Sequence, residues 1–259
     1  MKNNQNISIR WFYMAIGVIS MLFAGVLYAW SILKSPFQTE FGWSQSSLAL
    51  NFTLAMTFFC VGGLLGARIS KRFGHRIALI IAGVLSALGF ILTGSLNDVA
   101  VLVLYITYGV LAGLGIGIAY NVSIATVSSW FPDKKGLCSG CLMMGFGASA
   151  LVLGNLADKM FKSDFGWRNT YIILGIAIFL ILLLAGLLLR KPDSDILFPE
   201  TKKGKNIKGE NFQIIDLTSK EMLCRPSFWM AFICISFLAA VGSSVISFAK
   251  DMALSVNAP

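Results

Sequence analysis

The chain has 259 residues, of which 56% are hydrophobic and only 13% charged, and its mean hydropathy is +0.76. This composition excludes an ordinary soluble globular domain and indicates a protein with several membrane-spanning helices. The net charge of +9 comes from basic residues in short segments between apolar stretches and forms no stripe or motif typical of nucleic-acid binding. We therefore expect a lipid bilayer, and not a nucleic acid, as its partner.

Seven apolar stretches are long enough to cross a bilayer. We expect six of them at about residues 11–33, 46–67, 77–96, 99–129, 137–157 and 170–189, and a seventh at about 228–248. A polar, lysine-rich stretch between the sixth and the seventh is typical of a solvated linker. The sequence thus predicts a six-helix bundle over residues 1–190, a central linker over 191–225, and over 226–259 the first helix of an incomplete second bundle.

Basic residues fall mainly on one side of this predicted membrane. That side receives the N-terminal tail, the segments 68–76 and 134–135, and the whole linker. The other side receives only Lys34, Lys159, Lys162, Arg168 and Lys250. The positive-inside rule therefore predicts a multi-pass protein of the plasma (inner) membrane with its N-terminus and central linker in the cytoplasm.

The fourth span carries Gly109, Gly113 and Gly117 on one helical face. In lipid, such a face lets the backbone of another helix approach closely. We assign these glycines, and Gly145 in the fifth span, to helix packing. The neighbouring side chains Met143, Met144 and Phe146 are expected to pack rather than to contact a substrate.

The spans differ in character. The third and sixth are almost wholly apolar and suit a lipid-facing periphery, whereas the other four hold the glycines and most polar groups and should face one another and a cavity. Two sets of three helices, each with one peripheral member, fit a transporter half built as an inverted repeat.

Polar side chains in the spans are few and uncharged. None of the six spans has an ionisable residue in its interior, which disfavours a proton-coupled carrier with an intramembrane carboxylate in this part of the chain. Tyr28, Tyr120 and Asn121 are the best candidates to line a cavity. For each of them an interfacial anchor or an interhelical hydrogen bond is an equally good interpretation.

The segment WFPDKKGLCSGCLMMG at residues 130–145 resembles the signature of the monocarboxylate porters. Residues 28–31, 41–44, 113–120 and 165–168 resemble the oxalate/formate antiporter-like branch of the major facilitator superfamily. The resemblance implies an all-α polytopic membrane protein, namely the N-terminal six-helix bundle of a major facilitator fold with a 3+3 inverted repeat, a cytoplasmic linker and a seventh helix, truncated after it.

This family resemblance also implies a function. A secondary transporter would move a small organic anion, such as oxalate, formate, lactate or pyruvate, by alternating access. The family's basic substrate ligands lie in the second helical half, which we expect on a longer chain or on a second polypeptide. Lys34 is the nearest candidate cation here, close to where monocarboxylate porters carry a functional lysine, although a snorkelling surface lysine is the favoured alternative.

The loop at residues 70–76 resembles the superfamily's loop between the second and third helices. Lys71 stands where the family commonly has an acidic residue, which puts the usual gating interaction in doubt. Lys71, Arg72, Gly74 and Arg76 are candidate gating residues, and orientation of the chain together with a glycine turn explains them equally well.

Other function classes are weaker. A membrane-embedded enzyme needs a nucleophile with a base in reach, but the only histidine, His75, lies in a loop and no G-x-S-x-G motif occurs. We expect no catalytic residue, no cofactor and no metal site, because the pair Cys138 and Cys141 has no second CxxC. A non-transporting remnant or a sensor stays open.

Overall fold

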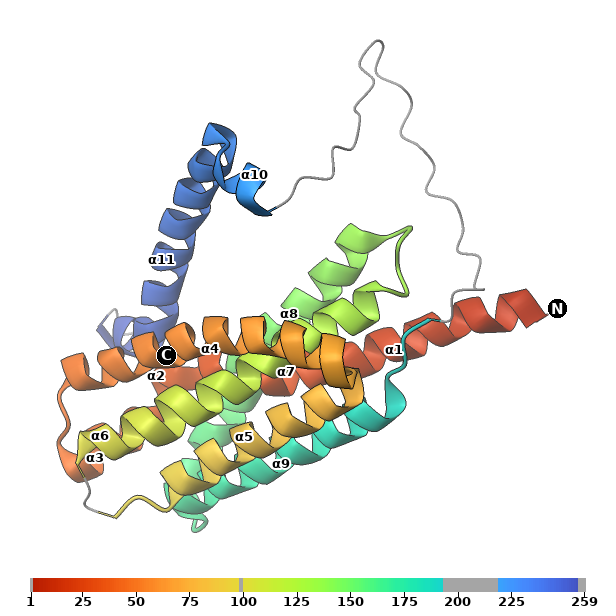
Figure 1. The fold of residues 1–259 in the computed structure, drawn as a ribbon. Helices are drawn as coiled ribbons and strands as arrows, with labels where there is room; N and C mark the ends of the chain where they lie inside the picture. The colour runs from red at the N-terminus through yellow and green to blue at the C-terminus, as the bar shows by residue number, and fades with distance from the viewer. Residues whose placement is uncertain (1, 98–99, 193–218, 256–259) are drawn as a thin grey trace. The chain divides into compact units, whose positions relative to one another are not determined.

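The computed structural model describes residues 2–97, 100–192 and 219–255, and this part of the chain consists of helices and loops without strands (Figure 1). The helices of the first unit are α1 (Lys2–Ala24), the 3₁₀ segment η1 (Gly25–Ala29), α2 (Trp30–Leu33), α3 (Ser35–Phe41), α4 (Gln45–Phe73), α5 (His75–Gly94), α6 (Val101–Leu104), the π-helix η2 (Tyr105–Ala112), α7 (Gly113–Ser128), α8 (Lys135–Phe161) and α9 (Gly166–Leu188). Two further helices, α10 (Ser219–Leu223) and α11 (Pro226–Ser255), follow. The described residues form 7 segments long and apolar enough to cross a membrane, which confirms the all-α polytopic fold.

The first span is longer than the sequence predicted. It was expected at residues 11–33, but the apolar rod runs over Ile9–Phe41. Pro36 lies in the first turn of α3, where a missing backbone N–H costs nothing. Gly42, with φ 64°, ends the rod in the left-handed region that favours glycine.

The glycines of the fourth span lie against α4. A Cβ atom at Gly113 would lie 2.7 Å from the carbonyl oxygen of Ala55, and one at Gly117 would overlap the carbonyl oxygen of Phe59. Gly109 meets the same helix one turn earlier. Because these contacts advance by four residues on both helices in the same direction, α4 and α7 are parallel neighbours with touching backbones.

A second glycine seam joins α1 and η1 to α8. A Cβ atom at Gly145 would lie 2.8 Å from the carbonyl oxygen of Val18, and one at Gly25 would overlap the carbonyl oxygen of Phe146. Gly154 faces α2 further along the same helix. The first and fifth spans are therefore parallel neighbours, like the second and fourth.

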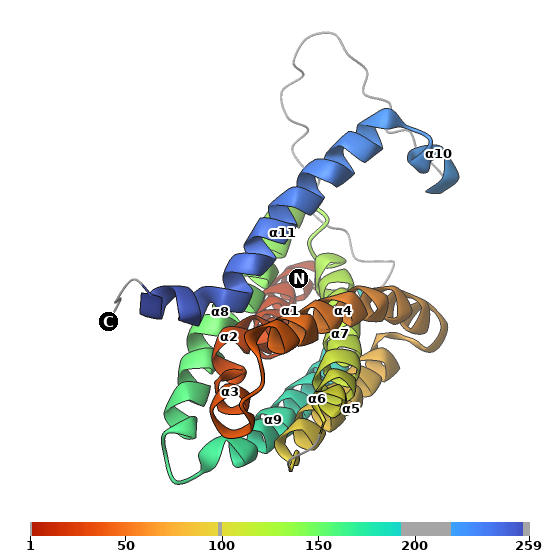
Figure 2. The same ribbon diagram turned by 90° about the vertical axis from the view of Figure 1, so that its left-hand side faces the viewer.

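The third and sixth spans form the remaining large contact. Gly83 of α5 faces Phe179, and Gly175 of α9 faces Phe90, so the two helices run antiparallel. They lie side by side in both views (Figure 1 and Figure 2). An inverted repeat relates spans one, two and three to spans four, five and six, respectively. It therefore relates the contact between spans one and five to the contact between spans four and two, and it leaves the contact between spans three and six unchanged. The packing thus has the pairing that a 3+3 inverted repeat requires.

Each helix of this antiparallel pair keeps one apolar face exposed. These faces consist of Ile77, Val84, Leu88 and Leu92 on α5, and of Ile173, Ile176, Leu180, Leu184 and Leu187 on α9. The exposed faces fit contact with lipid, as the sequence suggested. The opposite faces are buried against each other, which an almost wholly apolar sequence could not indicate.

The chain divides into two compact units, Met1–Pro199 and Glu200–Pro259. The first unit holds the six spans described above. In the second, α10 and α11 are described, and Pro226 occupies the first position of α11, as proline prefers. Most of the linker expected at residues 191–225 lies outside the described residues.

The two glycine environments give a matched test of the packing. We expect Gly117→Ala to destabilise the bundle by about 1–3 kcal/mol, because the added methyl group must displace the α4 backbone. Gly147→Ala should leave stability unchanged or raise it slightly, since a Cβ atom there meets no atom within 4 Å. Thermal unfolding in detergent measures both variants, and equal shifts in Tm would contradict the close contact of α4 and α7.

Candidate functional site

Four aromatic rings from four different spans meet in the first unit. Phe146 of α8 makes edge-on contacts with Tyr28 of η1, at 4.9 Å between ring centroids, and with Tyr120 of α7, at 5.0 Å. Phe59 of α4 lies 5.1 Å from Tyr120 and 6.0 Å from Phe146. We call these four residues the aromatic cluster. The glycine seams bring their helices close enough for the rings to touch.

The aromatic cluster presents polar groups without charge. Tyr28 and Tyr120 are half-buried, and neither hydroxyl makes a hydrogen bond to another of the described residues. Asn121, next to Tyr120, is also half-buried, and its amide nitrogen lies 3.9 Å from the position a Cβ atom would take at Gly63. Two phenol groups and one amide can therefore donate hydrogen bonds to a ligand that approaches this part of the bundle.

Lys34 lies apart from this cluster. Six helical residues separate it from Tyr28, which is about 9 Å along a helix axis. It stands at the short break between α2 and α3, and its side chain is 2% exposed. The favoured interpretation as a snorkelling surface lysine is therefore wrong for this conformation. No sequence pattern marked this burial.

The candidate gating residues lie at the other end of α4. Lys71, Arg72 and Arg76 are exposed, and none of them makes an ion pair within the described part of the chain. Gly74 has φ 89°, so the turn between α4 and α5 needs a glycine. Twelve residues of α4 separate Lys71 from Phe59, about 18 Å of helix, so this loop does not contact the aromatic cluster.

His75, which follows this turn, has a structural contact. Its Nε2 atom lies 2.7 Å from the carbonyl oxygen of Leu189, at the end of α9. The indole Nε1 of Trp130 donates to the next carbonyl oxygen, that of Arg190, at 2.6 Å. These two side chains therefore bind the backbone of the two residues that follow α9.

A buried ion pair fastens the start of α1 to the loop between α7 and α8. The guanidinium Nη1 of Arg10 donates to both carboxylate oxygens of Asp133, at 2.9 and 3.2 Å, and the two side chains are only 6% and 7% exposed. The guanidinium also lies 5.1 Å from the ring of Phe131, and Tyr13 packs on Trp130 at 4.8 Å. The loop motif WFPD, residues 130–133, thus binds the start of α1, a contact that the sequence did not reveal.

A second ion pair lies at the opposite end of the bundle. Glu40 of α3 pairs with Arg168 of α9 at 2.7 Å and accepts a hydrogen bond from the indole of Trp167. The Arg168 guanidinium lies 4.4 Å from the Trp167 ring and donates to the carbonyl oxygen of Leu96 at 3.4 Å. Both ends of the six-helix bundle are therefore held by a charge pair set among aromatic rings.

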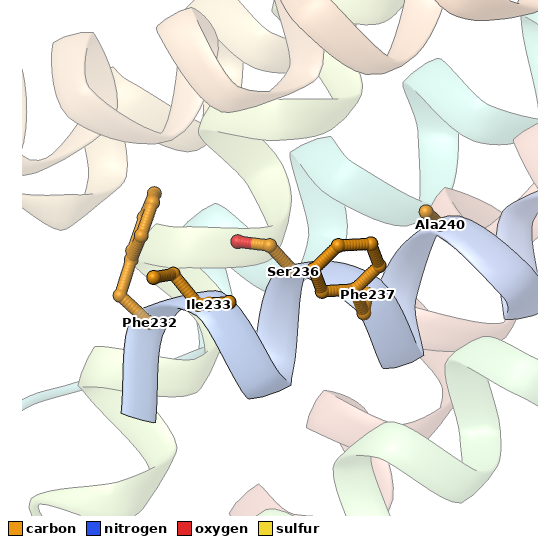
Figure 3. A pocket seen from close by; sticks show the side chains of 5 residues that line it. All are labelled: Phe232, Ile233, Ser236, Phe237 and Ala240. Atoms are coloured by element: carbon orange, nitrogen blue, oxygen red, sulfur yellow. The ribbon is translucent and has the colours of Figure 1, made fainter. Parts of the chain in front are cut away.

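Other possible sites are weak. Among the described residues, no group of three or more His, Cys, Asp or Glu side chains could hold a metal ion. A hollow on α11 is lined by Phe232, Ile233, Ser236, Phe237 and Ala240 (Figure 3). Its lining comes from one helix and offers a single hydroxyl group, so it lacks the converging polar groups of a ligand site.

The sequence profile of the Major Facilitator Superfamily matches residues 12–257. The chain belongs to the Major Facilitator Superfamily. It is therefore a multi-pass membrane protein, and the family resemblance seen in its motifs is confirmed. The fold agrees with that of a solved member, the xylose transporter XylE from E. coli in its inward open conformation, at a TM-score of 0.59 and 20% identity over 71% of this chain and 48% of that chain.

Two curated relatives confirm the branch of the superfamily. The oxalate:formate antiporter of Oxalobacter formigenes is 30% identical over 246 residues, 91% of this chain and 55% of that protein. Monocarboxylate transporter 2 of Mus musculus is 28% identical over 196 residues, 73% of this chain and 39% of that protein. The chain thus spans about half the length of the relatives it matches, or less.

The ion pair of Arg10 and Asp133 can be tested by a double-mutant cycle. Arg10→Ala and Asp133→Ala should each destabilise the bundle by about 3 kcal/mol, since each leaves a nearly buried charge without its partner. The double variant should cost clearly less than the sum of the two. Thermal unfolding in detergent measures the cycle.

Lys162→Ala is the control, because Lys162 is 75% exposed in its pair with Asp158 and such pairs contribute about 0–1 kcal/mol. Strict additivity of the Arg10 and Asp133 variants would show that the two residues are not coupled.

Proposed function

We propose that this chain supplies the N-terminal half of a secondary transporter of small carboxylates. The observation that carries the proposal is the aromatic cluster, whose two open phenol groups come from spans one and four of a charge-free bundle. The names of the relatives, an oxalate:formate antiporter and a monocarboxylate transporter, support the substrate class. In this proposal Tyr28, Tyr120 and Asn121 donate hydrogen bonds to a carboxylate. Because the acceptor is charged, these hydrogen bonds are stronger than those between neutral groups.

The proposed mechanism is alternating access. One six-helix bundle rocks against a second around a site near the middle of the membrane. Since spans one to six offer no cation next to the aromatic cluster, the second bundle supplies the charge that neutralises the substrate. That bundle lies on a longer chain or on a second polypeptide. Lys34 stays a candidate substrate ligand in this proposal, although it is buried where α2 meets α3 and lies apart from the aromatic cluster.

The proposal includes a domain order and an orientation. The six-helix bundle covers residues 1–190, the linker 191–225 and the first helix of the second bundle 226–259. The N-terminus and the linker face the cytoplasm, and the protein lies in the plasma (inner) membrane. This orientation is supported by eight exposed basic residues at the end of the bundle where α1, α5 and α8 begin: Arg68, Lys71, Arg72, Arg76, Lys134, Lys135, Arg190 and Lys191.

The loop residues Lys71, Arg72, Gly74 and Arg76 would contribute to gating at this cytoplasmic end. Their charges are exposed and lack an acidic partner in the described part of the chain, so an acidic or helix-terminal group of the second bundle could bind them in one of the two transport states. Lys71 in place of the family's acidic residue reverses the sign of that contact.

The decisive experiment is uptake and exchange of labelled oxalate, formate, lactate and pyruvate in proteoliposomes. The chain as given is compared with a version extended by a second six-helix bundle. Carboxylate transport by the extended version alone is the expected result. Transport by the 259-residue chain alone would contradict the need for a second bundle, and no transport of any of these anions by either would overturn the carboxylate assignment.

The roles of the two phenol groups can be tested in the transporting version. Tyr28→Phe and Tyr120→Phe should each lower kcat/KM about tenfold or more, because each removes one hydrogen bond to a charged group. Tyr13→Phe is the matched control, since it removes the same atom but keeps the ring that packs on Trp130. Equal activity of all three variants would exclude the phenol groups as ligands.

A further inference from the structure

The side-chain amide of Asn51, on α4, is the most unusual polar group in the first unit. The residue is 0% exposed, and neither its Oδ1 nor its Nδ2 atom has a hydrogen-bond partner in the part of the chain that the structure describes. A buried amide normally makes at least one hydrogen bond, because leaving it unpaired forfeits its hydration without compensation. The unpaired amide of Asn51 therefore raises the free energy of the arrangement that the structure shows.

The segment opposite Asn51 is the π-helix η2. Its residue Gly109 approaches so closely that a Cβ atom there would lie 3.2 Å from Asn51 Oδ1 and 3.3 Å from Leu54 Cβ. A π-helix has longer hydrogen-bonded turns than an α-helix, with i→i+5 bonds; it is rare, and it occurs frequently at functional sites. Where it joins an α-helix, one backbone carbonyl group loses its donor within the helix.

This π-helix contacts the neighbouring spans at its start and in its middle. At its start, the hydroxyl of Tyr105 donates to the carbonyl oxygen of Ser47 on α4, at 3.1 Å. In its middle, the ring of Tyr108 packs on Trp30 of α2 at 4.6 Å, and the Tyr108 hydroxyl is buried without a partner. Two polar groups with no hydrogen bond, those of Asn51 and Tyr108, thus lie at one irregular segment, which indicates a second arrangement of this segment in which they are satisfied.

We propose that η2 is a register switch and that Asn51 is the positioning residue that controls it. In the second register the extra residue of the π-helix moves along the rod, and the carbonyl group freed at its new edge accepts a hydrogen bond from Asn51 Nδ2. The portion of the rod that the extra residue passes rotates by about 100° and shifts by about 1.5 Å, the values for one helical residue.

This inference deepens the proposed function and rests on it for its role in transport. Tyr120 and Asn121 follow the switch on the same continuous rod, in α7. A change of register alters how the outer part of that rod lies on α4 and α2 while the glycine contacts of α7 hold its inner part in place. The switch therefore gives the outer part of the fourth span two arrangements against α4 and α2, while Tyr120 and Asn121 stay in place and the bundle stays folded.

The test uses Asn51→Leu, which keeps the size of the side chain but removes the amide. In the purified 259-residue chain in lipid nanodiscs, this variant should raise Tm, since the unpaired amide is gone. Hydrogen–deuterium exchange of residues 105–112 should slow about fivefold, because the second register loses one hydrogen bond. Ser86→Ala is the control: its hydroxyl on α5 is equally buried and unpartnered but faces Gly115, in the regular part of α7. That variant should leave exchange at residues 105–112 unchanged.

Two results would overturn the switch. A lower Tm for Asn51→Leu would mean that the amide is satisfied in the folded protein, for example by a bound water molecule. A higher Tm with unchanged exchange at residues 105–112 would mean that the amide has no second register to stabilise. If Asn51→Leu does not fold, Asn51→Ala is used in its place, because it removes the same amide. Exchange at residues 105–112 is then the deciding measurement.

Because the exchange measurement needs no substrate, the two proposals can fail separately. If exchange slows in Asn51→Leu but no version of the protein transports a carboxylate, the register switch is supported and the proposed function is overturned. Carboxylate transport with unchanged exchange would overturn the switch alone. In a transporting version, Asn51→Leu should lower kcat about fivefold with little change in KM, a split that a purely structural role would not produce.

Discussion

The fold depends on backbone contact between helices at glycine. In a bilayer, lipid solvates an apolar side chain as well as another helix does, so burial of apolar surface gives little reason for helices to associate. Close approach at small residues replaces it. Two seams are such contacts: Gly113 and Gly117 of α7 lie against α4, and Gly25 and Gly145 join the first and fifth spans. They bring together the four helices whose aromatic side chains form the candidate site.

The distribution of charge follows from the same solvent. Charged groups are costly in hydrocarbon, and the two ion pairs that join different parts of the first unit, Arg10 with Asp133 and Glu40 with Arg168, lie at the ends of its spans. The interior offers hydroxyl, amide and aromatic groups. An anion at the aromatic cluster would therefore be oriented by this bundle but neutralised by another, which makes cooperation of two bundles a requirement of electrostatics and not only of family precedent.

The sequence predicted what depends on composition along the chain. Apolar stretches located the spans, and glycine spacing identified the faces at which α7 could pack, because both properties are local. It could not show that Phe59 and Phe146 meet Tyr28 and Tyr120, since partners from four helices are a property of packing. It missed the ion pair of Arg10 and Asp133 for the same reason. The burial of Lys34 is likewise a property of packing, and neither the 3₁₀ segment nor the π-helix had a residue pattern of its own.

The two irregular segments, η1 and η2, lie in the two spans that carry the candidate tyrosine ligands. The 3₁₀ segment η1 contains Tyr28, and the π-helix η2 begins the rod that carries Tyr120, so both interruptions occur in the two spans that an inverted repeat relates to each other. Charge pairs hold the ends of the bundle and glycine seams hold its length. Departures from regular α-helix are then the remaining places where a span can change shape at small cost. Their position in the spans that bear the candidate ligands links the mobility of the bundle to the site it would serve.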